Sequence, residues 1–314
     1  MFKPEVFIKE ITRELSQRIR GKALIACSGG VDSSTAAVIV NRAIGERLTA
    51  VFVDTGYMRK NEPEIIKRQL KSLGLNLKFV DAKEEFYNAL KGITKPEEKR
   101  RVIGERFIRV FERVAKEIGA RYLVQGTIAP DWIESGGGLR DRIKSHHNVG
   151  ALPEQLNLEI IEPLKDLYKD EIRKLARHLG IEASERQPFP GPGLAVRIIG
   201  EATKERTETI REACAIVEEE IERAVENGEM DRPWQYFAVL LPVKSVGVRG
   251  DVRTYGDTIV VRAVESIDGM TAAYSKIPHN VLERISIRIT NNLKSISRVV
   301  YDITNKPPAT IEWE

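Results

Sequence analysis

The chain has 314 residues, of which 31% are charged, and its formal net charge at pH 7 is +4. This length suits two domains of about 150 residues. The small positive charge favours anionic ligands without requiring nucleic acid; the alternative is that the charged residues only keep the surface soluble. The two cysteines form no C-x-x-C pair, which excludes a disulfide framework and a cysteine-ligated zinc site.

Two further features of the sequence indicate where in the cell the protein is located. No stretch reaches the roughly 20 apolar residues that cross a bilayer, and the N-terminal segment has mixed charges instead of a signal-peptide core. We therefore expect a cytoplasmic protein with no membrane partner and no nucleic-acid partner.

The first strand predicted from the sequence, residues 23–27, is followed by S-G-G-V-D-S-S at residues 28–34, which opens a helical pattern. Glycines let backbone N–H groups approach an anion, and a helix start adds unpaired amides and a positive dipole end. Asp32 would hold a Mg²⁺ ion that neutralises phosphates. The run predicts a site for a metal-bound nucleotide; the alternative is an ordinary turn that caps a helix.

Two other phosphate loops do not match this run. G-x-x-x-x-G-K-[ST] needs a lysine that the run lacks, and G-x-G-x-x-G does not occur in this turn, so cleavage of ATP at the γ-phosphate is disfavoured. The run S-G-G-V-D-S resembles the pyrophosphate loop of the ATP pyrophosphatases. That resemblance implies that the loop grips the β- and γ-phosphates while a substrate oxygen attacks the α-phosphorus.

Apolar runs and amphipathic segments alternate from residue 22 to residue 180. This pattern predicts an α/β domain with a doubly wound parallel sheet. Gly45, Gly74, Gly119 and Gly180 each follow a helical stretch and predict helix ends, and Asn61 with Glu64 predicts a capping box. Ligands of such sheets gather beyond the carboxyl ends of the strands, where Asp54 and residues 125–127 would join the loop. The expected strands are 23–27, 48–54, 77–81, 122–125 and 158–161.

The segment from about residue 128 to residue 153 is long, glycine-containing and charged. We interpret it as a lid over the nucleotide that carries Lys144; a merely floppy insertion is the alternative. Its adjacent histidines, His146 and His147, favour polar or substrate contacts over zinc, because no third ligand lies nearby.

The run Q-P-F-P-G-P-G at residues 187–193 breaks regular structure and predicts a domain boundary. We expect a nucleotide-binding domain over residues 1–187 and a smaller α+β domain over residues 188–314. The elements expected in the second domain are helices at 203–227 and 279–293 and strands at 236–246, 258–264 and 297–302.

Over nearly its full length the chain resembles the ATP pyrophosphatase and dimerisation regions of GMP synthetase. Five further segments join the loop in carrying this resemblance: F-V-D-T-G at 52–56, K-R-R-V-I-G at 99–104, I-K-S-H-H-N-V at 143–149, F-P-G-P-G-L-A-V-R at 189–197 and K-P-P-A-T-I-E-W-E at 306–314. The resemblance implies a C–N ligase that adenylates the C2 oxygen of xanthosine monophosphate (XMP) with ATP, releases pyrophosphate, and then lets ammonia displace AMP to give GMP.

The resemblance also implies roles for individual residues. ATP and its pyrophosphate would be bound by Ser28, Gly29, Gly30, Val31, Asp32, Ser33, Ser34, Val53 and Gly126, with Asp32 as the Mg²⁺ ligand and Lys144 as the lid contact. XMP would be bound by Arg100, Asp251, Lys306, Thr310 and Glu312. Both domains would then contribute to the site. A solvated helix charge at Arg100 and a merely docked segment at 306–314 are the alternatives.

The chain differs in one respect from those members of this family in which the synthetase is fused to a glutaminase. A class I glutaminase needs a cysteine in a G-x-C-x-G elbow, and neither Cys27 nor Cys214 lies in one. We expect the two-subunit form of the enzyme, in which a separate glutamine amidotransferase subunit supplies ammonia. The resemblance further implies a homodimer through the second domain.

Two other functions are compatible with parts of the sequence. A tRNA thiolase uses a similar loop but needs a reactive cysteine near the nucleotide. A nucleotide-sensing or RNA-binding module would suit the small α+β domain and the sequence pI of about 8.9, although no RNP-like aromatic strand is present.

Overall fold

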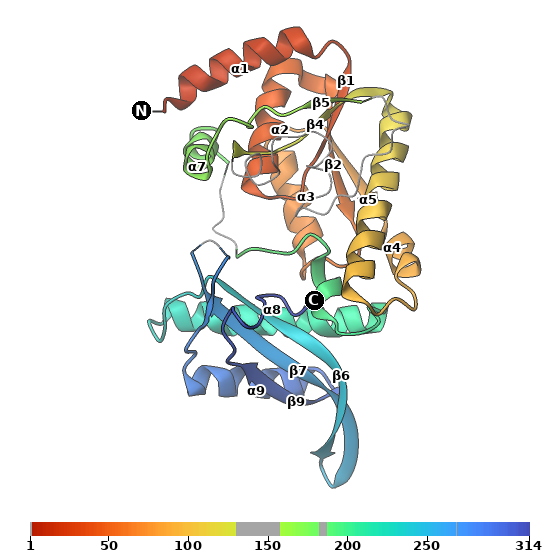
Figure 1. The fold of residues 1–314 in the computed structure, drawn as a ribbon, viewed down its shortest axis with the longest axis vertical. Helices are drawn as coiled ribbons and strands as arrows, with labels where there is room; N and C mark the ends of the chain where they lie inside the picture. The colour runs from red at the N-terminus through yellow and green to blue at the C-terminus, as the bar shows by residue number, and fades with distance from the viewer. Residues whose placement is uncertain (1, 130–157, 182–186, 268) are drawn as a thin grey trace. The chain divides into compact units, whose positions relative to one another are not determined.

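The computed structural model describes residues 2–129, 158–181, 187–267 and 269–314. The chain divides into two compact units, each built from three segments (Figure 1). Unit 1 consists of Met1–Thr55, Asn61–Ala82 and Gly104–Glu185, and unit 2 of Gly56–Lys60, Lys83–Ile103 and Arg186–Glu314. Two short segments from the first third of the chain therefore belong to the same unit as the C-terminal part.

Unit 1 contains a five-stranded sheet in the order β3-β2-β1-β4-β5. All four strand pairings are parallel, so the expected α/β fold with a parallel sheet is confirmed. The central strand β1 has a fully buried interior, as expected for a strand covered on both faces. The strands are β1 (Lys22–Ala26), β2 (Leu48–Asp54), β3 (Leu77–Asp81), β4 (Ala120–Val124) and β5 (Glu159–Ile161).

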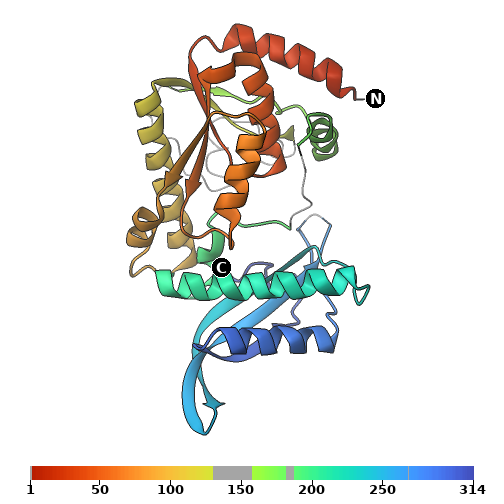
Figure 2. The same ribbon diagram turned by 180° about the vertical axis from the view of Figure 1, so that it is seen from behind.

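Helices cover both faces of this sheet. Helices α1, α2 and α7 pack against one another on one side, and α5 lies on the other side in both views of the ribbon (Figures 1 and 2). The helices that contribute to unit 1 are α1 (Pro4–Arg18), α2 (Val31–Ile44), α3 (Glu62–Ser72), the C-terminal part of α5 (Pro96–Ile118) and α7 (Lys169–His178), with a short 3₁₀ turn η1 (Gly45–Arg47) after α2.

The expected capping box at the start of α3 is wrong. Asn61 precedes the helix with φ 59°, in the left-handed region, and its side chain accepts no capping hydrogen bond. A capping residue needs extended backbone to turn its side chain toward the helix amides, so this conformation prevents the bond. By contrast, the glycines expected to end helices at positions 45, 74, 119 and 180 all have positive φ.

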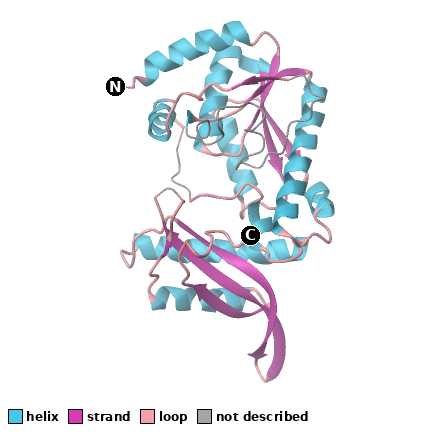
Figure 3. Cartoon of the chain, in the orientation of Figure 1, coloured by secondary structure: helices cyan, strands magenta, loops and turns pink. Residues whose placement is uncertain are grey.

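Unit 2 contains a four-stranded sheet with helices on one face (Figure 3), and this confirms the expected α+β architecture. Strand β7 pairs antiparallel with β6 and β8 and parallel with β9. Helix α8 packs on β6, and α9 packs on α8 and β9. The elements are α4 (Lys83–Ala89), the start of α5, η2 (Gly193–Arg197), α8 (Lys204–Glu226), β6 (Gln235–Arg249), β7 (Val252–Glu265), β8 (Ala273–Tyr274), α9 (His279–Asn292) and β9 (Ile296–Asp302).

Within the described residues, every helix is too short or too polar to cross a lipid bilayer.

Candidate functional site

The loop between β1 and α2 lies at the carboxyl edge of the sheet, between the ends of β2 and β4. Gly29 has φ 79°, and a Cβ atom there would lie 2.6 Å from Ile66 Cγ1. Both the conformation and the lack of space therefore require glycine. Helix α2 begins at Val31, and its N-cap residue Gly30 has no side chain that could cap it, which suits a helix start that binds an anion through its first amides.

Polar side chains crowd this turn. Ser28 Oγ lies 3.3 Å from Ser33 Oγ and accepts a 3.4 Å hydrogen bond from the Gly30 N–H. Ser34 Oγ, Thr35 Oγ1 and Asp32 Oδ1 are buried and have no hydrogen-bond partner among the described residues. An unpaired buried polar group costs about 1–3 kcal/mol. Three such atoms in one helical turn fit a site whose ligand supplies the missing partners.

Asp32 forms an ion pair with a lysine of α7. Its Oδ2 atom accepts a 2.6 Å hydrogen bond from Nζ of Lys169, the first residue of α7. The pair is partly exposed, with 48% of the lysine side chain and 29% of the aspartate side chain accessible. Sequence reasoning missed Lys169, because nothing in its local pattern distinguishes it from an ordinary helix lysine.

The residues at the loop fit a Mg²⁺ ion that is shared with a nucleotide. No cluster of three or more histidine, cysteine, aspartate or glutamate side chains occurs in the part of the chain that the structure describes. Mg²⁺ in nucleotide sites is usually held by one or two carboxylates together with phosphate oxygens. Asp32 can supply such a carboxylate, because its buried Oδ1 atom has no hydrogen-bond partner in the described part of the chain.

Two further predicted ATP-binding residues lie on the strands that flank β1. Val53 is buried near the carboxyl end of β2, and Gly126 follows β4. A Cβ atom on Gly126 would lie 3.2 Å from the Cα and N atoms of Ser33, so this glycine lets the chain pass close to the start of α2. Lys144 and the predicted lid from residue 130 onward lie outside the described residues.

Four of the five predicted XMP-binding residues lie on or against the segment 306–314 in unit 2. Glu312 accepts hydrogen bonds from Arg197 at 2.9 and 3.1 Å and from Gln235 Nε2 at 2.9 Å. Lys306 Nζ donates to the Gly269 carbonyl at 2.8 Å. Thr310 Oγ1 donates to the Glu312 carbonyl, and Arg100 Nη2 donates to the Glu314 carbonyl.

Buried cations hold this segment in place. Arg197 is completely buried and lies over the Phe237 ring, 4.1 Å from its centroid. Burial alone would lower the pKa of Arg197, but the carboxylate of Glu312 raises it above its usual value. Arg262, also completely buried, donates to the carbonyls of Thr304, Thr310 and Ile311.

A second buried ion pair anchors the end of the segment. Lys99 Nζ, on α5, donates to a carboxylate oxygen of Glu314 and to the carbonyls of Ala195 and Ile198. Burial lowers the pKa of the lysine and raises that of the glutamate, so desolvation opposes the charge of both partners. The mutual attraction and the two carbonyls offset that cost.

Asp251 lies apart from the other four. It occupies the turn between β6 and β7, which are paired up to Arg249 and Val252. This hairpin extends beyond the helices of unit 2, away from the segment 306–314 (Figure 1). Its role in XMP binding stays a prediction.

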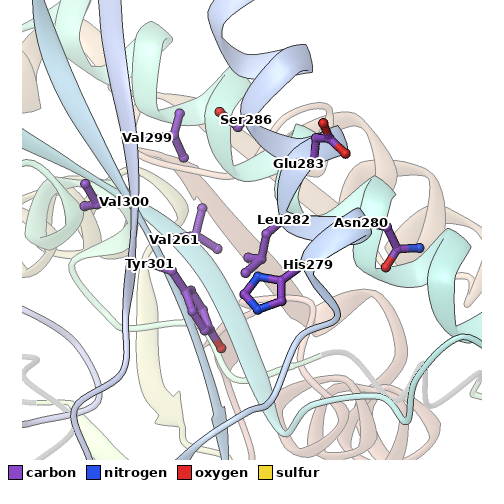
Figure 4. A pocket seen from close by; sticks show the side chains of 9 residues that line it. All are labelled: Val261, His279, Asn280, Leu282, Glu283, Ser286, Val299, Val300 and Tyr301. Atoms are coloured by element: carbon purple, nitrogen blue, oxygen red, sulfur yellow. The ribbon is translucent and has the colours of Figure 1, made fainter.

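A pocket of about 510 Å³ lies elsewhere in unit 2, between α9 and strands β7 and β9. Figure 4 shows His279 and Tyr301 facing each other across it, with Val261 and Leu282 beside them. None of the predicted site residues that the structure describes lines this pocket, and the Tyr301 hydroxyl donates to the Ser275 carbonyl.

Both cysteines are buried and neither is suited to nucleophilic chemistry. Burial raises the pKa of the Cys27 thiol to about 12 and also raises that of Cys214. A thiolate is the reactive form, so these environments disfavour a thiolase.

Comparison with known families divides the chain into two parts. Residues 22–187 match the family described as queuosine biosynthesis protein QueC, and residues 220–313 match the GMP synthase C terminal domain. Among solved structures, the chain is similar to NMN synthetase from Francisella tularensis, with 17% identity, coverage of 62% of this chain and 78% of that chain, and a TM-score of 0.48.

Curated relatives cover both parts together. The chain is 62% identical to the B subunit of the glutamine-hydrolyzing GMP synthase of Pyrococcus furiosus, over 99% of this chain and 97% of the relative. It is 60% identical to the corresponding protein of Methanopyrus kandleri over 100% of both chains, and 54% identical to that of Thermoplasma acidophilum over 98% of both. Identity at this level over the full length shows that the chain belongs to the family of GMP synthase B subunits and is an enzyme of the ligase class.

Proposed function

We propose that the chain makes GMP from XMP, ATP and ammonia through an adenylated XMP intermediate. Membership of this GMP synthase family supports GMP synthesis from XMP with ATP. The proposal that this chain binds ATP rests on the turn at the start of α2. There, Asp32 Oδ1, Ser34 Oγ and Thr35 Oγ1 are buried without hydrogen-bond partners among the described residues.

In this proposal unit 1 binds ATP. The pyrophosphate part lies in the loop, where amides and hydroxyls meet its charge. Val53 and Gly126 contact the nucleoside end, and Lys144 reaches the phosphates from the lid. The loop residues are Ser28, Gly29, Gly30, Val31, Asp32, Ser33 and Ser34.

Asp32 would hold Mg²⁺ together with phosphate oxygens. When bound, this ion neutralises the phosphates and polarises the bond that breaks. Asp32 lies in the first turn of α2, so its carboxylate would be presented at the same helix start as the loop amides.

Unit 2 would bind XMP. Arg100 and Lys306 supply positive charge for the monophosphate, and Glu312 accepts hydrogen bonds from purine N–H groups. Arg197 and Gln235 orient the Glu312 carboxylate, which removes rotamers that could not make those bonds. Thr310 and Asp251 are the remaining residues that we propose to contact XMP.

The chemistry explains why ATP is consumed. The oxo group at C2 of a purine is a poor leaving group, so its oxygen first attacks the α-phosphorus of ATP, and pyrophosphate leaves. Ammonia then adds at C2, and AMP leaves with the former C2 oxygen. The residues act by position and charge, and no covalent protein intermediate is needed.

We further propose that a separate glutamine amidotransferase supplies the ammonia. The relatives are named as one lettered subunit of a glutamine-hydrolyzing enzyme, which supports the existence of a partner protein. A homodimer formed through the C-terminal domain and a cytoplasmic location complete the proposal.

The first experiment measures pyrophosphate and AMP with and without XMP, ammonium and Mg²⁺. We expect pyrophosphate release to require XMP and Mg²⁺, and GMP, identified by its absorption spectrum, to require ammonium as well. Asp32→Asn should abolish release, whereas Glu159→Gln, at an exposed ion pair of unit 1, should not. Release of ADP and orthophosphate in place of AMP and pyrophosphate would refute the mechanism.

A second experiment addresses the ammonia source. The purified chain should make GMP with ammonium salts and fail to do so with glutamine. Glutamine-dependent synthesis by this chain alone would contradict a separate glutaminase.

A further inference from the structure

We propose that the buried ion pair of Lys99 and Glu314 positions Arg100 for the monophosphate of XMP. This inference rests on the proposed function of unit 2, in which Arg100 supplies positive charge for that phosphate. The observation behind it is that Glu314 binds two neighbouring residues of α5. Its carboxylate accepts a hydrogen bond from Lys99 Nζ, and its main-chain carbonyl accepts one from Arg100 Nη2.

The ammonium group of Lys99 is fixed in one orientation. The side chain is completely buried, and Nζ donates to the Ile198 carbonyl at 2.6 Å, to the Ala195 carbonyl at 3.2 Å and to the carboxylate of Glu314. An ammonium group has three N–H donors, so these three acceptors use all of them. Lys99 is therefore a rigid anchor for whatever its carboxylate partner belongs to.

Glu314 is held through both of its carboxylate oxygens. Oε2 accepts the hydrogen bond from Lys99, and Oε1 accepts a 3.4 Å hydrogen bond from the Gly200 N–H. Only 4% of the glutamate side chain is accessible. Rotation of this side chain would break one of these bonds inside a buried site, so its main-chain carbonyl is held in place as well.

The charges also fix the register of the segment 306–314. Its end alternates glutamate with uncharged residues, as I-E-W-E at 311–314. A shift by one residue would bring an uncharged side chain to Arg197 and to Lys99, and leave two buried cations without a carboxylate. A buried ion pair adds little net stability over apolar residues, but loss of one partner is strongly destabilising. The particular contribution of the Lys99 pair is therefore a defined position.

This position determines where the Arg100 guanidinium lies. Arg100 is partly exposed, and its Nη2 donates to the Glu314 carbonyl. A guanidinium carries five N–H donors in one plane, so a bond through one nitrogen orients the plane while other N–H groups can face a phosphate. An arginine without such a contact would lose more rotamer freedom when it binds an anion. The carbonyl held by the buried pair thus preorganises Arg100.

The test measures the affinities of XMP and xanthosine for the full chain by calorimetry. Xanthosine lacks the monophosphate, so the ratio of the two affinities reports what that phosphate contributes. The variants are Arg100→Met, Lys99→Met, the double variant of both, and Glu314→Gln, which keeps the main-chain carbonyl. Lys204→Met, at an exposed ion pair of unit 2, is the matched control.

Arg100→Met is expected to lower the affinity ratio by about 10- to 100-fold, as for a lost hydrogen bond between charged groups. Lys99→Met and Glu314→Gln should lower it by about 3- to 10-fold, which corresponds to ordering one long side chain on binding. The double variant should match Arg100→Met within about twofold, because Lys99 acts through Arg100. Lys204→Met should keep the wild-type ratio.

Xanthosine affinity distinguishes positioning from support of the fold. It should stay within about twofold of the wild type in Lys99→Met, because Arg197 and Gln235 still hold Glu312. A pair that only supports the fold would, when broken, weaken XMP and xanthosine equally, and that result would overturn the inference.

Two further results would overturn it: a wild-type ratio in Lys99→Met and Glu314→Gln, or an additional loss when Lys99→Met is combined with Arg100→Met. If Lys99→Met does not fold, Glu314→Gln decides. A wild-type ratio in Arg100→Met refutes the proposed phosphate contact, and the positioning role with it. A ratio lowered in Arg100→Met but unchanged in the other single variants refutes only the positioning role.

Discussion

The guanidinium of Arg197 and the carboxylate of Glu312 are joined by two hydrogen bonds although 115 positions separate them in the sequence. Arg197 is completely buried, and Glu312 lies on the segment predicted to bind XMP. The same carboxylate accepts a third hydrogen bond from Gln235. The pair therefore couples the stability of unit 2 to the orientation of a predicted substrate contact.

Arg197→Met should lower the free energy of unfolding by about 3 kcal/mol, because removal of one partner leaves the other charge without compensation. It should also weaken XMP binding, since Glu312 loses the group that orients it. Denaturant unfolding and calorimetry with XMP measure the two effects. Glu212→Gln, at the exposed pair with Lys60, is the control and should change stability by less than about 1 kcal/mol. Wild-type stability in Arg197→Met would contradict the coupling.

Gly29→Ala should abolish ATP binding. Its φ of 79° disfavours any side chain by about 1–2 kcal/mol, and the added methyl would meet Ile66. The matched control is Gly74→Ala, which has φ 69° but no neighbouring atom within 4 Å. Both variants carry the backbone cost, so calorimetry with ATP isolates the effect of the loop. Equal ATP affinity in the two variants would show that the loop does not bind the nucleotide.

Acid should destabilise unit 2 through Glu220. Its side chain is fully buried; burial alone would raise the pKa, but hydrogen bonds from Arg288 and Arg284 lower it below the usual 4.5. A carboxylate with a lowered pKa stabilises the fold above its unfolded pKa, and this contribution is lost as the pH falls through the folded pKa.

Thermal unfolding between pH 3 and pH 7 measures this effect. Glu220→Gln should be less stable at pH 7 by about 2 kcal/mol, as for lost hydrogen bonds to a charged group whose arginine partners stay partly exposed, and should lose less stability on acidification than the wild type. Parallel pH profiles for the two proteins would argue against the assignment to Glu220.

Thiol labelling should be slow in the native protein. Burial raises the pKa of Cys27 to about 12, so almost no thiolate forms at pH 8. We expect an aromatic disulfide reagent to modify Cys27 and Cys214 only after denaturant is added. Cys27→Ala should still form AMP in the presence of XMP. Rapid labelling of native protein, or loss of AMP formation in Cys27→Ala, would revive the thiolase alternative.

Much of the fold follows from local patterns. The runs 48–54 and 77–81 predict β2 and β3 with their observed bounds, because apolar strands alternate with helices that end at glycines. The capping box at Asn61 failed for a local reason too, since sequence letters do not reveal that this residue adopts a left-handed conformation.

The composition of the two compact units was harder to predict from the sequence. Gly56–Lys60 and Lys83–Ile103 lie early in the chain, yet they belong to the compact unit that contains the C-terminal part. Lys99 shows why: its ammonium is neutralised by Glu314, and no pattern near Lys99 encodes a partner 215 positions away.

By itself, the sequence determined the parallel sheet, the α+β unit and the glycine-rich turn after β1, because each depends on hydrophobic periodicity and backbone freedom within a few neighbouring residues. Only the tertiary structure decided that Lys169 meets Asp32 and that Arg197 holds Glu312. Both pairings depend on how distant segments pack, and for the completely buried Arg197 the high cost of an unpaired charge selects its partner.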